Sequence, residues 1–246
     1  MMKQISQVES RQEAGFTLVE LAVVMVIIGL LIGGILKGQE LIANAQVTAT
    51  IAQLKGMDAA VTTFKDKYGQ LPGDMRNGGT RLNNCAGNCA TNGNGNGRIG
   101  TNDSVLVTHP ATTENARAWF HLSAANLIQG VQVNGNMFFG EGVPASKAGG
   151  GIRIGYDDDG GGIGGLANFR PGHFLVVTSA PAGAIGPTNG ALPGSQAAQI
   201  DRKLDDGRSR QGSVGSFGTN CDVAAAGGTY DEQDDGLCVV VVQVQG

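Results

Sequence analysis

The sequence predicts an α+β protein in which a long N-terminal helix packs on a small, loop-rich antiparallel β-sheet domain. An uncharged apolar run occupies residues 21–36, helical periodicity continues from it to about Lys67, and short apolar segments separated by glycine-rich turns follow. Glycine makes up 41 of the 246 residues, without the three-residue period of collagen. We therefore expect one irregular domain beyond the helix.

The first element is an apolar segment, residues 16–36, that is long enough to cross a bilayer. As a helix it would measure roughly 31 Å, about the thickness of the hydrocarbon core. Glu20 lies near its start, where a lone carboxylate in lipid would cost at least a few kcal/mol, on the order of 3. If the chain is cut after Gly15, the new amine of Phe16 can neutralise Glu20, on the same helix or on a neighbouring subunit.

Two other kinds of membrane segment need comparison with this one. A secretory signal peptide would have a basic start, a shorter apolar core and a small-residue cleavage site after that core. A plain single-span anchor explains the length of the run, but it explains neither the Gly15-Phe16 pair nor Glu20.

Residues 15–20, Gly-Phe-Thr-Leu-Val-Glu, and the apolar run after them resemble the type IV prepilin leader junction. This junction is shared by type IV pilins and type II secretion pseudopilins. The resemblance implies a type IV pilin-like fold, cleavage between Gly15 and Phe16 by a prepilin peptidase, and N-methylation of Phe16, which keeps the positive charge. It also implies assembly into a helical filament with this segment in the core, where Glu20 serves assembly.

The resemblance divides the chain into four parts. Residues 1–15 would be the leader peptide, residues 16–36 the transmembrane and filament-core helix, residues 37–67 its amphipathic continuation, and residues 68–246 a Gly-rich α+β domain. The expected partners are other copies or related pilins in a filament, the prepilin peptidase, an inner-membrane assembly platform, and the membrane itself before assembly. The precursor would be a single-pass protein of the bacterial inner membrane, and the assembled form a cell-surface pilus or a periplasmic pseudopilus.

The amphipathic continuation of the helix ends at a run of seven residues, 68–74, Tyr-Gly-Gln-Leu-Pro-Gly-Asp. Gly69 can form the C-cap and Pro72 cannot continue a helix. The Tyr-Gly-x-x-Pro-Gly-Asp pattern resembles the same junction in pseudopilins and many minor pilin-like proteins. We expect Asp74 to be a turn residue rather than a base.

The four cysteines, Cys85, Cys89, Cys221 and Cys238, all follow the apolar run. An even number on the exported side indicates two disulfides, for which three pairings exist. We favour Cys85 with Cys89 and Cys221 with Cys238, because each pair closes a local loop. The second loop is similar to the C-terminal disulfide loop of many pilins. The alternative, a four-thiolate zinc site, requires two closely spaced pairs, and Cys221 lies too far from Cys238 to form one.

The polar loop 76–108 contains a pattern with the spacing of an EF-hand calcium loop: Asn92, Asn94, Asn96 and Gly97, with Asp103 at the twelfth place. The pattern lacks the usual carboxylates and flanking helices, so a series of Gly/Asn turns is the favoured interpretation.

A second helix is expected over residues 114–127, capped by Thr112 or Thr113 and ended by Gly130. His121 lies among its apolar residues, and we interpret it as a hydrogen-bonded structural histidine. A third, short helix is expected over residues 196–204. Strands are expected over residues 136–139, 151–156, 173–179 and 237–244. The last is apolar on both faces and should therefore be a central or covered strand.

Two acidic clusters provide candidate calcium ligands. They are Asp157, Asp158 and Asp159, and Asp231, Asp234 and Asp235, of which the second set lies between Cys221 and Cys238. Dense carboxylates suit calcium, and pseudopilins as a class use calcium near the C-terminal region. Solvated turns are the alternative. A third group, Asp201, Asp205 and Asp206, can bind a metal or take part in local ion pairing and capping, which we favour.

No catalytic motif is present, and the three histidines are scattered. The formal net charge of -4 argues against a broad nucleic-acid-binding face. We therefore expect no enzyme and no cofactor apart from calcium, with a tethered hydrolase domain as the alternative. The expected function is that of a structural subunit of a type IV pilus-like filament. The alternatives are a type II secretion pseudopilin and a minor tip subunit that binds a ligand.

Overall fold

The computed structural model describes residues 15–100, 106–158, 163, 166, 169–223, 228–233 and 236–245. The chain divides into two compact units, Met1–Ile42 and Ala43–Gly246, and helix α1 (Leu18–Tyr68) contributes to both. Among the described residues, α1 is the helix that is long and apolar enough to cross a membrane, with a mean hydropathy of 2.7 over its most apolar window. The prediction that one helix continues from the apolar run through residues 37–67 is confirmed. The helix ends at Tyr68, one residue after the predicted Lys67.

Helix α1 ends where the sequence predicts a C-cap. Gly69 adopts a φ of +70°, which glycine reaches without the steric cost that a Cβ imposes, and its N–H donates to the carbonyl oxygen of Lys65 at 2.7 Å. Within the second unit the helix buries a stripe whose members are three or four residues apart. The stripe consists of Val47, Thr50, Ile51, Leu54, Met57, Ala60, Val61 and Phe64.

Three short helical segments follow, namely α2 (Gly78–Arg81), the 3-10 helix η1 (Gly87–Ala90) and α3 (Glu114–Ala124). Thr113 occupies the N-cap position of α3, but its hydroxyl donates to the carbonyl oxygen of Pro110 at 2.8 Å instead of capping the helix. The expected end at Gly130 is wrong, because Asn126 already turns to a φ of 58° just after Ala124.

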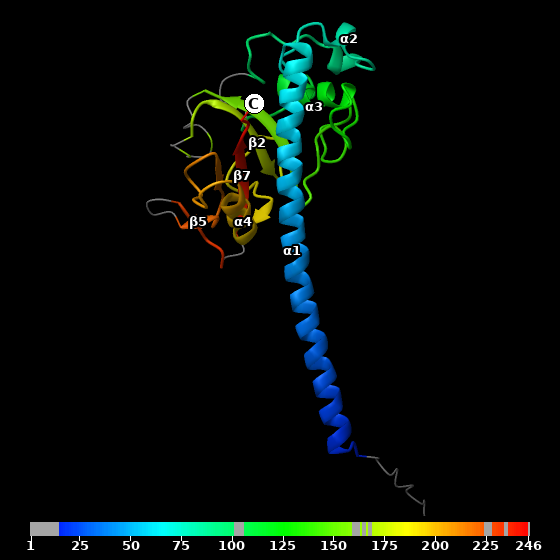
Figure 1. The fold of residues 1–246 in the computed structure, drawn as a ribbon, viewed down its shortest axis with the longest axis vertical. Helices are drawn as coiled ribbons and strands as arrows, with labels where there is room; N and C mark the ends of the chain where they lie inside the picture. Colours follow the sequence, from blue (N-terminus) through cyan, green and yellow to red (C-terminus); the bar gives the residue numbers. More distant parts are fainter. Residues whose placement is uncertain are drawn as a thin grey trace, which may run out of the picture. The chain divides into compact units, whose positions relative to one another are not determined.

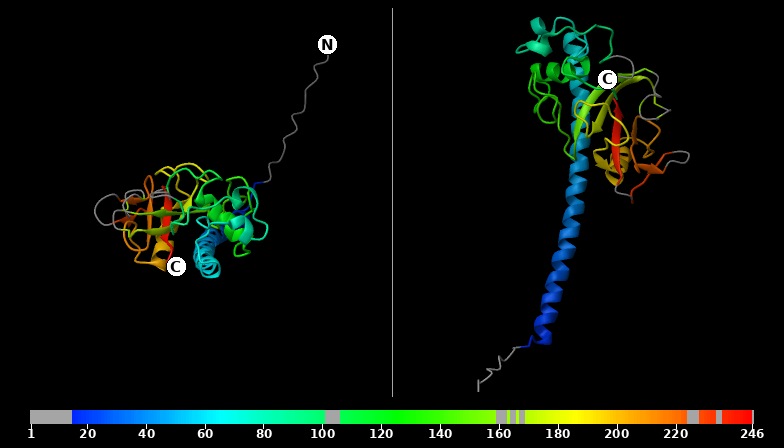
Figure 2. Two further views of the ribbon diagram at one scale, coloured as in Figure 1. Left: turned by 90° about the horizontal axis from the view of Figure 1, so that it is seen from above. Right: turned by 180° about the vertical axis from the view of Figure 1, so that it is seen from behind.

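The second unit contains a five-stranded antiparallel sheet built around β7 (Leu237–Gln243). Strand β7 pairs with β2, β3 and β4, and β2 pairs with β1 at the sheet edge. Figures 1 and 2 show β7 running alongside the second half of α1. The other strands of this sheet are β1 (Gly151–Asp157), β2 (Gly172–Thr178), β3 (Leu192–Pro193) and β4 (Val214–Phe217). Helix α4 (Gly194–Leu204) follows β3 directly, and β5 (Asp222–Val223) pairs with β6 (Thr229–Tyr230) in a separate ribbon.

Three of the predicted strands match β1, β2 and β7, and the predicted central position of the last strand is confirmed. The strand predicted at residues 136–139 is wrong, because this stretch forms turns with a single isolated bridge between Phe139 and Val143. The turn is closed locally by the N–H of Gly140, which adopts a φ of +85° and donates to the carbonyl oxygen of Val143. The short strands β3 to β6 were not predicted from the sequence.

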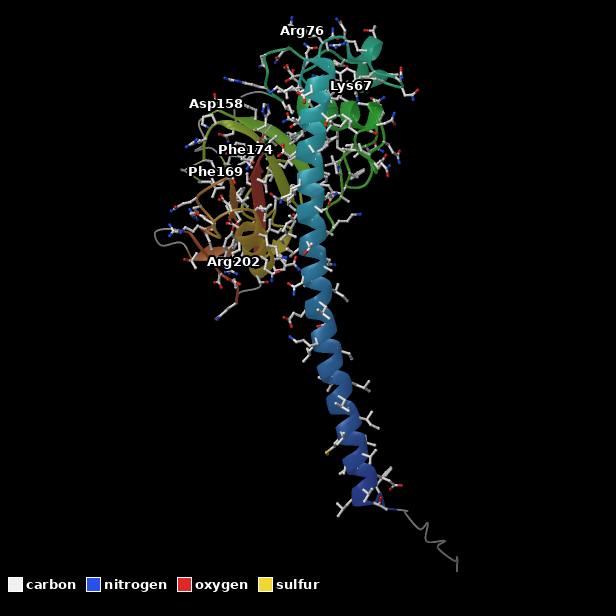
Figure 3. The ribbon with its side chains drawn as sticks, viewed as in Figure 1. Lys67, Arg76, Asp158, Phe169, Phe174 and Arg202 are labelled. Carbon is white, nitrogen blue, oxygen red and sulfur yellow. A yellow bond between two sulfur atoms is a disulfide. The ribbon has the colours of Figure 1, made fainter. Side chains whose placement is uncertain are left out.

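Apolar side chains cover both faces of the sheet. On the face that carries α1, the buried side chains of Phe64, Trp119 and Val240 belong to one cluster. On the other face, Phe169 and Phe174 pack with ring centroids 5.9 Å apart (Figure 3). Val239 and Val241 of β7 point to this second cluster while Val240 points to the first. This alternation explains why β7 is apolar on both faces.

Candidate processing and assembly site

The site begins at Gly15 and Phe16, directly before α1. The Phe16 side chain is 89% exposed. Thr17 caps the first turn, since its N–H and its hydroxyl both donate to Oε2 of Glu20 at 2.9 Å, and the N–H of Glu20 donates to Oγ1 of Thr17 at 3.2 Å. This reciprocal arrangement is a capping box, which satisfies backbone donors that a helix start leaves without partners. Glu20 therefore lies against the positive end of the helix dipole.

Among the described residues of its own unit, the apolar half of α1 has no packing partner. The large apolar side chains from Leu18 to Leu36 are all about half exposed or more, and Figure 3 draws them extending from the helix on its own. The run stops at Lys37, whose Nζ lies 2.5 Å from Oε2 of Glu40 on the exposed helix surface. Such a length of apolar surface needs lipid or other apolar helices around it.

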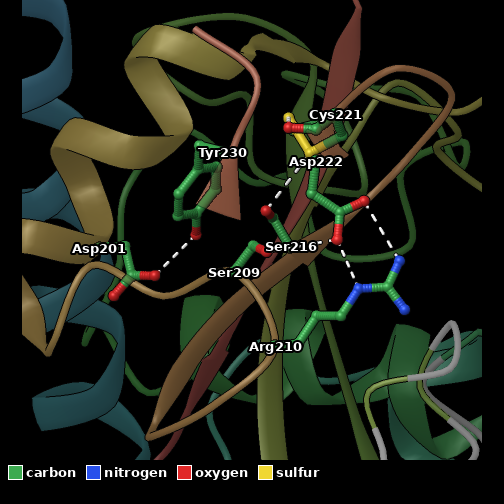
Figure 4. The surroundings of a disulfide bond; sticks show 8 residues. Asp201, Ser209, Arg210, Ser216, Cys221, Asp222 and Tyr230 are labelled. Carbon is green, nitrogen blue, oxygen red and sulfur yellow. Dashed lines mark hydrogen bonds and ion pairs between the residues drawn. A yellow bond between two sulfur atoms is a disulfide. The ribbon is translucent and has the colours of Figure 1, made fainter. Parts of the chain in front are cut away.

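The four cysteines form two disulfides, Cys85–Cys89 and Cys221–Cys238, which are the pairings that the sequence analysis favoured. This pairing leaves no thiolate for the alternative zinc site. Because Cys238 is the second residue of β7, the second disulfide links the segment around β5 to the central strand (Figure 4).

Two further contacts surround this disulfide in Figure 4. The guanidinium of Arg210 holds both carboxylate oxygens of Asp222. The hydroxyl of Tyr230 donates to Oδ2 of the fully buried Asp201 at 2.7 Å, and the N–H of Gly207 donates to its Oδ1 at 3.0 Å. Burial raises the pKa of Asp201 to about 6 and raises the pKa of Tyr230 as well.

Oxygens of Asp201, Asp205 and Asp206 lie within 4.8 Å of one another, the distance range of a metal site. The chain's own donors already contact each of these carboxylates. Asp205 accepts the N–H of Val214 at 3.2 Å, and Asp206 accepts the N–H of Arg208 at 2.9 Å. These contacts support the local capping role that the sequence analysis favoured.

The described residues include only part of each candidate calcium cluster. Asp157 is buried at the end of β1, opposite Gly172, and Asp158 follows it. Asp231 follows β6, and its Oδ1 accepts the N–H of Gln233 at 3.1 Å. Asp159, Asp234 and Asp235 lie outside the described residues. Calcium at either cluster stays a prediction.

The loop with EF-hand spacing encloses a carboxylate of the protein. Asp74 accepts the N–H groups of Gly95, Asn96 and Gly97 at 2.6, 3.1 and 2.8 Å. Glu114 accepts those of Asn94 and Gly100 in the same way, at 2.8 and 3.0 Å.

The asparagine oxygens of this loop also have donors. The side-chain oxygens of Asn92, Asn94 and Asn96 accept the N–H groups of Asn77, Asn96 and Arg98. Backbone N–H groups directed at a carboxylate create a surrounding suited to an anion. The arrangement is the Gly/Asn turn series, held by Asp74; Asp103 lies outside the described residues.

His121 is fully buried and hydrogen-bonded, as predicted. Its Nδ1 accepts the N–H of Gly73 at 3.0 Å, and its Nε2 lies 2.9 Å from the carbonyl oxygen of Cys89. Burial lowers the pKa of His121, and its two hydrogen bonds connect Gly73, in the turn after α1, to Cys89 of the first disulfide.

Two contributors to these sites were missed in the sequence. The partnership of Thr17 with Glu20 follows the Thr-x-x-Glu capping-box pattern, which the sequence does contain. The anchoring role of Asp74 has no local signal, because its partners come about twenty residues later in the chain.

The structure defines a class of protein: an α+β domain on an N-terminal helix that can span a membrane, with one carboxylate in the first turn of that helix. Residues 10–36 match the model of the prokaryotic N-terminal methylation motif. The chain therefore carries the prepilin-type leader that type IV pilins and pseudopilins share. This leader is the kind of sequence that a prepilin peptidase processes. No curated protein and no solved structure gives a significant match.

Proposed function

We propose that this protein is a structural, non-catalytic subunit of a type IV pilus-like filament, cleaved between Gly15 and Phe16 and assembled through α1. The proposal rests on the apolar half of α1, whose large side chains are exposed from Leu18 to Leu36. These residues lie within the stretch that matches the N-terminal methylation motif. In the precursor the bilayer covers this surface. In the filament the same surface packs against other copies of the helix.

Glu20 provides the register of each added subunit. Its Oε2 is engaged by Thr17, whereas its Oε1 accepts no hydrogen bond within the described residues. Cleavage creates an amine on Phe16, and a carboxylate in apolar surroundings strongly favours such a cation as its partner. A neighbouring subunit that supplies the amine therefore docks only where the two groups meet.

The test is Glu20→Ala, compared with Glu40→Ala as a matched control on the same helix. Glu40 is an exposed carboxylate beyond the apolar run, paired with Lys37. We expect export and cleavage of both variants, a loss of sheared or envelope filaments for Glu20→Ala, and normal assembly for Glu40→Ala. Normal filament assembly by Glu20→Ala would overturn the mechanism.

Mass spectrometry of the N-terminus measures processing directly. We expect methylated Phe16 as the first residue of protein isolated from the native host. Its recovery in sheared surface filaments would support the pilus subunit. An intact leader, or cleavage elsewhere, would contradict the proposal as a whole.

A pseudopilin of a type II secretion system is the second candidate. The Tyr-Gly-x-x-Pro-Gly-Asp junction at residues 68–74 favours it, while the Cys221–Cys238 disulfide favours a pilus. A pseudopilin would remain with the cell envelope as a short periplasmic filament after shearing. The third candidate, a minor tip subunit whose loops bind a ligand, would be recovered at a small fraction of the bulk subunit.

A further inference from the structure

A cavity of about 370 Å³ opens in the second unit beside the turn that ends α1. Its lining comes from the last turns of α1, the residues directly after the helix, the Gly/Asn loop and the start of β2. Binding sites for small organic molecules usually measure about 300–1,000 Å³. The cavity is therefore large enough for a small organic ligand.

Two side chains on the α1 side of the cavity have hydrogen-bond donors that no described residue uses. Lys65 is exposed, and its ammonium group forms no ion pair among the described residues. The side-chain oxygen of Gln70 accepts the N–H of Arg76 and a guanidinium N–H of Arg81, both at 3.3 Å. Because both partners are donors, they identify the oxygen of this amide and leave its NH₂ group available.

His173 supplies a third donor from the opposite side of the cavity. Its Nε2 accepts the N–H of Ile99 at 3.1 Å, so a neutral ring carries its proton on Nδ1. Within the described part of the chain, no acceptor contacts Nδ1. The ring also packs against the edge of Tyr156, with ring centroids 5.2 Å apart, which fixes its orientation.

The carboxylate in the lining, Asp74, is already engaged by the protein. Its oxygens accept three backbone N–H groups of residues 95–97, and the residue is only 2% exposed. Two further cations adjoin the lining: Arg76 donates to the carbonyl oxygen of Asn94, and Arg81 donates to Gln70. Free donors with positive charge around them suit an anion that has several acceptor oxygens.

We propose that this cavity binds a small organic anion whose phosphate or carboxylate group accepts hydrogen bonds from Lys65, Gln70 and His173. Such a group supplies the acceptor oxygens that the three donors lack within the protein. It fills only part of the cavity, and the organic remainder of the ligand contacts Leu71, an apolar side chain of the lining. This inference goes beyond the proposed filament function, because the site lies within one chain and needs no filament.

The test uses the histidines as probes, since the full chain contains three. The purified full chain in detergent, with isotope-labelled histidine, is titrated with sodium phosphate at neutral pH and constant ionic strength, and NMR records the ring signals. We expect a saturable shift of the His173 signal, which the variant His173→Gln assigns. His109 and His121 are buried and lie outside the lining, so their signals should stay unchanged and report on the intact fold.

Sodium acetate and sodium chloride are titrated in parallel. Saturation by phosphate alone would support the site and identify a phosphate ester as the ligand class, and saturation by acetate alone would support it and identify a carboxylate. An equal shift with chloride would overturn the proposal, because chloride would then satisfy the site without the oxygens of a phosphate or carboxylate group.

Lys65→Gln and Lys67→Gln form a matched pair of variants. Both remove one positive charge from α1, but residues two apart face different sides of a helix, and Lys67 lies over the Tyr68 ring and outside the lining. We expect Lys65→Gln to raise the dissociation constant of phosphate by about tenfold, because a charge-assisted hydrogen bond is lost. Lys67→Gln should bind as the wild type does.

Gln70→Glu provides an independent variant. It keeps an acceptor for Arg76 and Arg81 and replaces the free NH₂ group with a carboxylate oxygen, so we expect it to abolish the saturable shift. The proposal would be overturned if neither phosphate nor acetate shifted the wild-type His173 signal saturably. Equal dissociation constants for Lys65→Gln and Lys67→Gln would overturn it as well. Either result leaves the filament proposal standing, because no filament takes part in the measurement.

Discussion

Thr17 and Glu20 hold each other in the first turn of α1, with both donors of Thr17 2.9 Å from Oε2 of Glu20. The threonine hydroxyl also accepts the N–H of Glu20. Because one hydroxyl serves as donor and acceptor, it orients the carboxylate to which the proposed assembly mechanism assigns the register.

Thr17→Val should therefore lower filament yield without preventing cleavage, since valine keeps the shape and removes the hydroxyl. Thr17→Ser should restore the yield, because serine supplies the same oxygen. Quantitative immunoblots of sheared or envelope filaments, beside the mass of the processed N-terminus, measure both. Equal yields for Thr17→Val and wild type would contradict a positioning role for Thr17.

The two disulfides should differ in their contribution to stability. Cys221–Cys238 closes a sequence separation of 17 residues and Cys85–Cys89 one of four. Loop-closure entropy then gives about 3 kcal/mol for the longer loop and about 2 kcal/mol for the shorter. Urea unfolding of the detergent-solubilised full chain, comparing the two double Cys→Ala variants, measures the difference. A larger loss for the Cys85/Cys89 variant would contradict this order.

His173 should make the domain less stable in acid. Burial, with Lys65 and Arg98 nearby, lowers its pKa to about 4, and its Nε2 accepts the N–H of Ile99 at 3.1 Å. In the unfolded chain a histidine titrates near 6.5, so the unfolded state takes up the proton first. This contribution is complete above about pH 6.5 and is lost as the pH falls to about 4.

The variant that tests this is His173→Gln, which keeps an acceptor but cannot be protonated. Relative to the wild type, the unfolding free energy of this variant should increase as the pH falls from 6.5 to 4, because the protonation of the unfolded histidine no longer destabilises the domain. Since His173 is partly exposed, we expect a difference of about 2 kcal/mol. Parallel profiles for the two proteins would rule out this role for His173.

Asp201 should make the domain more stable in acid, which is the opposite of the effect of His173. Its pKa rises from 3.8 to about 6 in the folded protein, mainly through burial, so the folded state binds the proton more tightly. Stability from this group is present below about pH 4 and is lost as the pH rises to about 6. Asp201→Asn should remove this pH dependence, which amounts to about 3 kcal/mol in unfolding free energy.

In the wild type the Asp201 and His173 contributions partly cancel between pH 4 and 6. The single variants should therefore show steeper pH profiles than the wild type, with opposite signs. Urea midpoints at several pH values measure both slopes. A wild-type profile as steep as that of either variant would contradict the cancellation.

Asp74→Ala should release the Gly/Asn loop. Three backbone N–H groups lose a charged acceptor, which we expect to cost about 3 kcal/mol in unfolding free energy. Hydrogen exchange at residues 95–97 should accelerate while exchange in β7 stays slow. Asp66→Ala, an exposed carboxylate near the end of α1, is the matched control. Unchanged exchange at residues 95–97 would show that Asp74 does not hold the loop.

Much of this architecture is predictable from local pattern. The apolar run and its Thr-x-x-Glu start predict where α1 begins, and Gly69 predicts where it ends, because caps and periodicity act within a few residues. Strands β1, β2 and β7 are apolar enough to be recognised. Strand β4, Val-Gly-Ser-Phe, is not, because its buried position comes from pairing with β7 and not from its own composition.

The sequence by itself determined the membrane-competent helix, the N-terminal methylation motif over residues 10–36, and the carboxylate at Glu20, because length, hydropathy and a short motif are properties of neighbouring residues. The tertiary structure alone decided that the loop with calcium-like spacing encloses Asp74, that β7 pairs with both β2 and β4, and that a cavity opens between Lys65 and His173. These features join residues far apart in the chain. They depend on how the sheet packs against the second half of α1, and no local pattern carries that information.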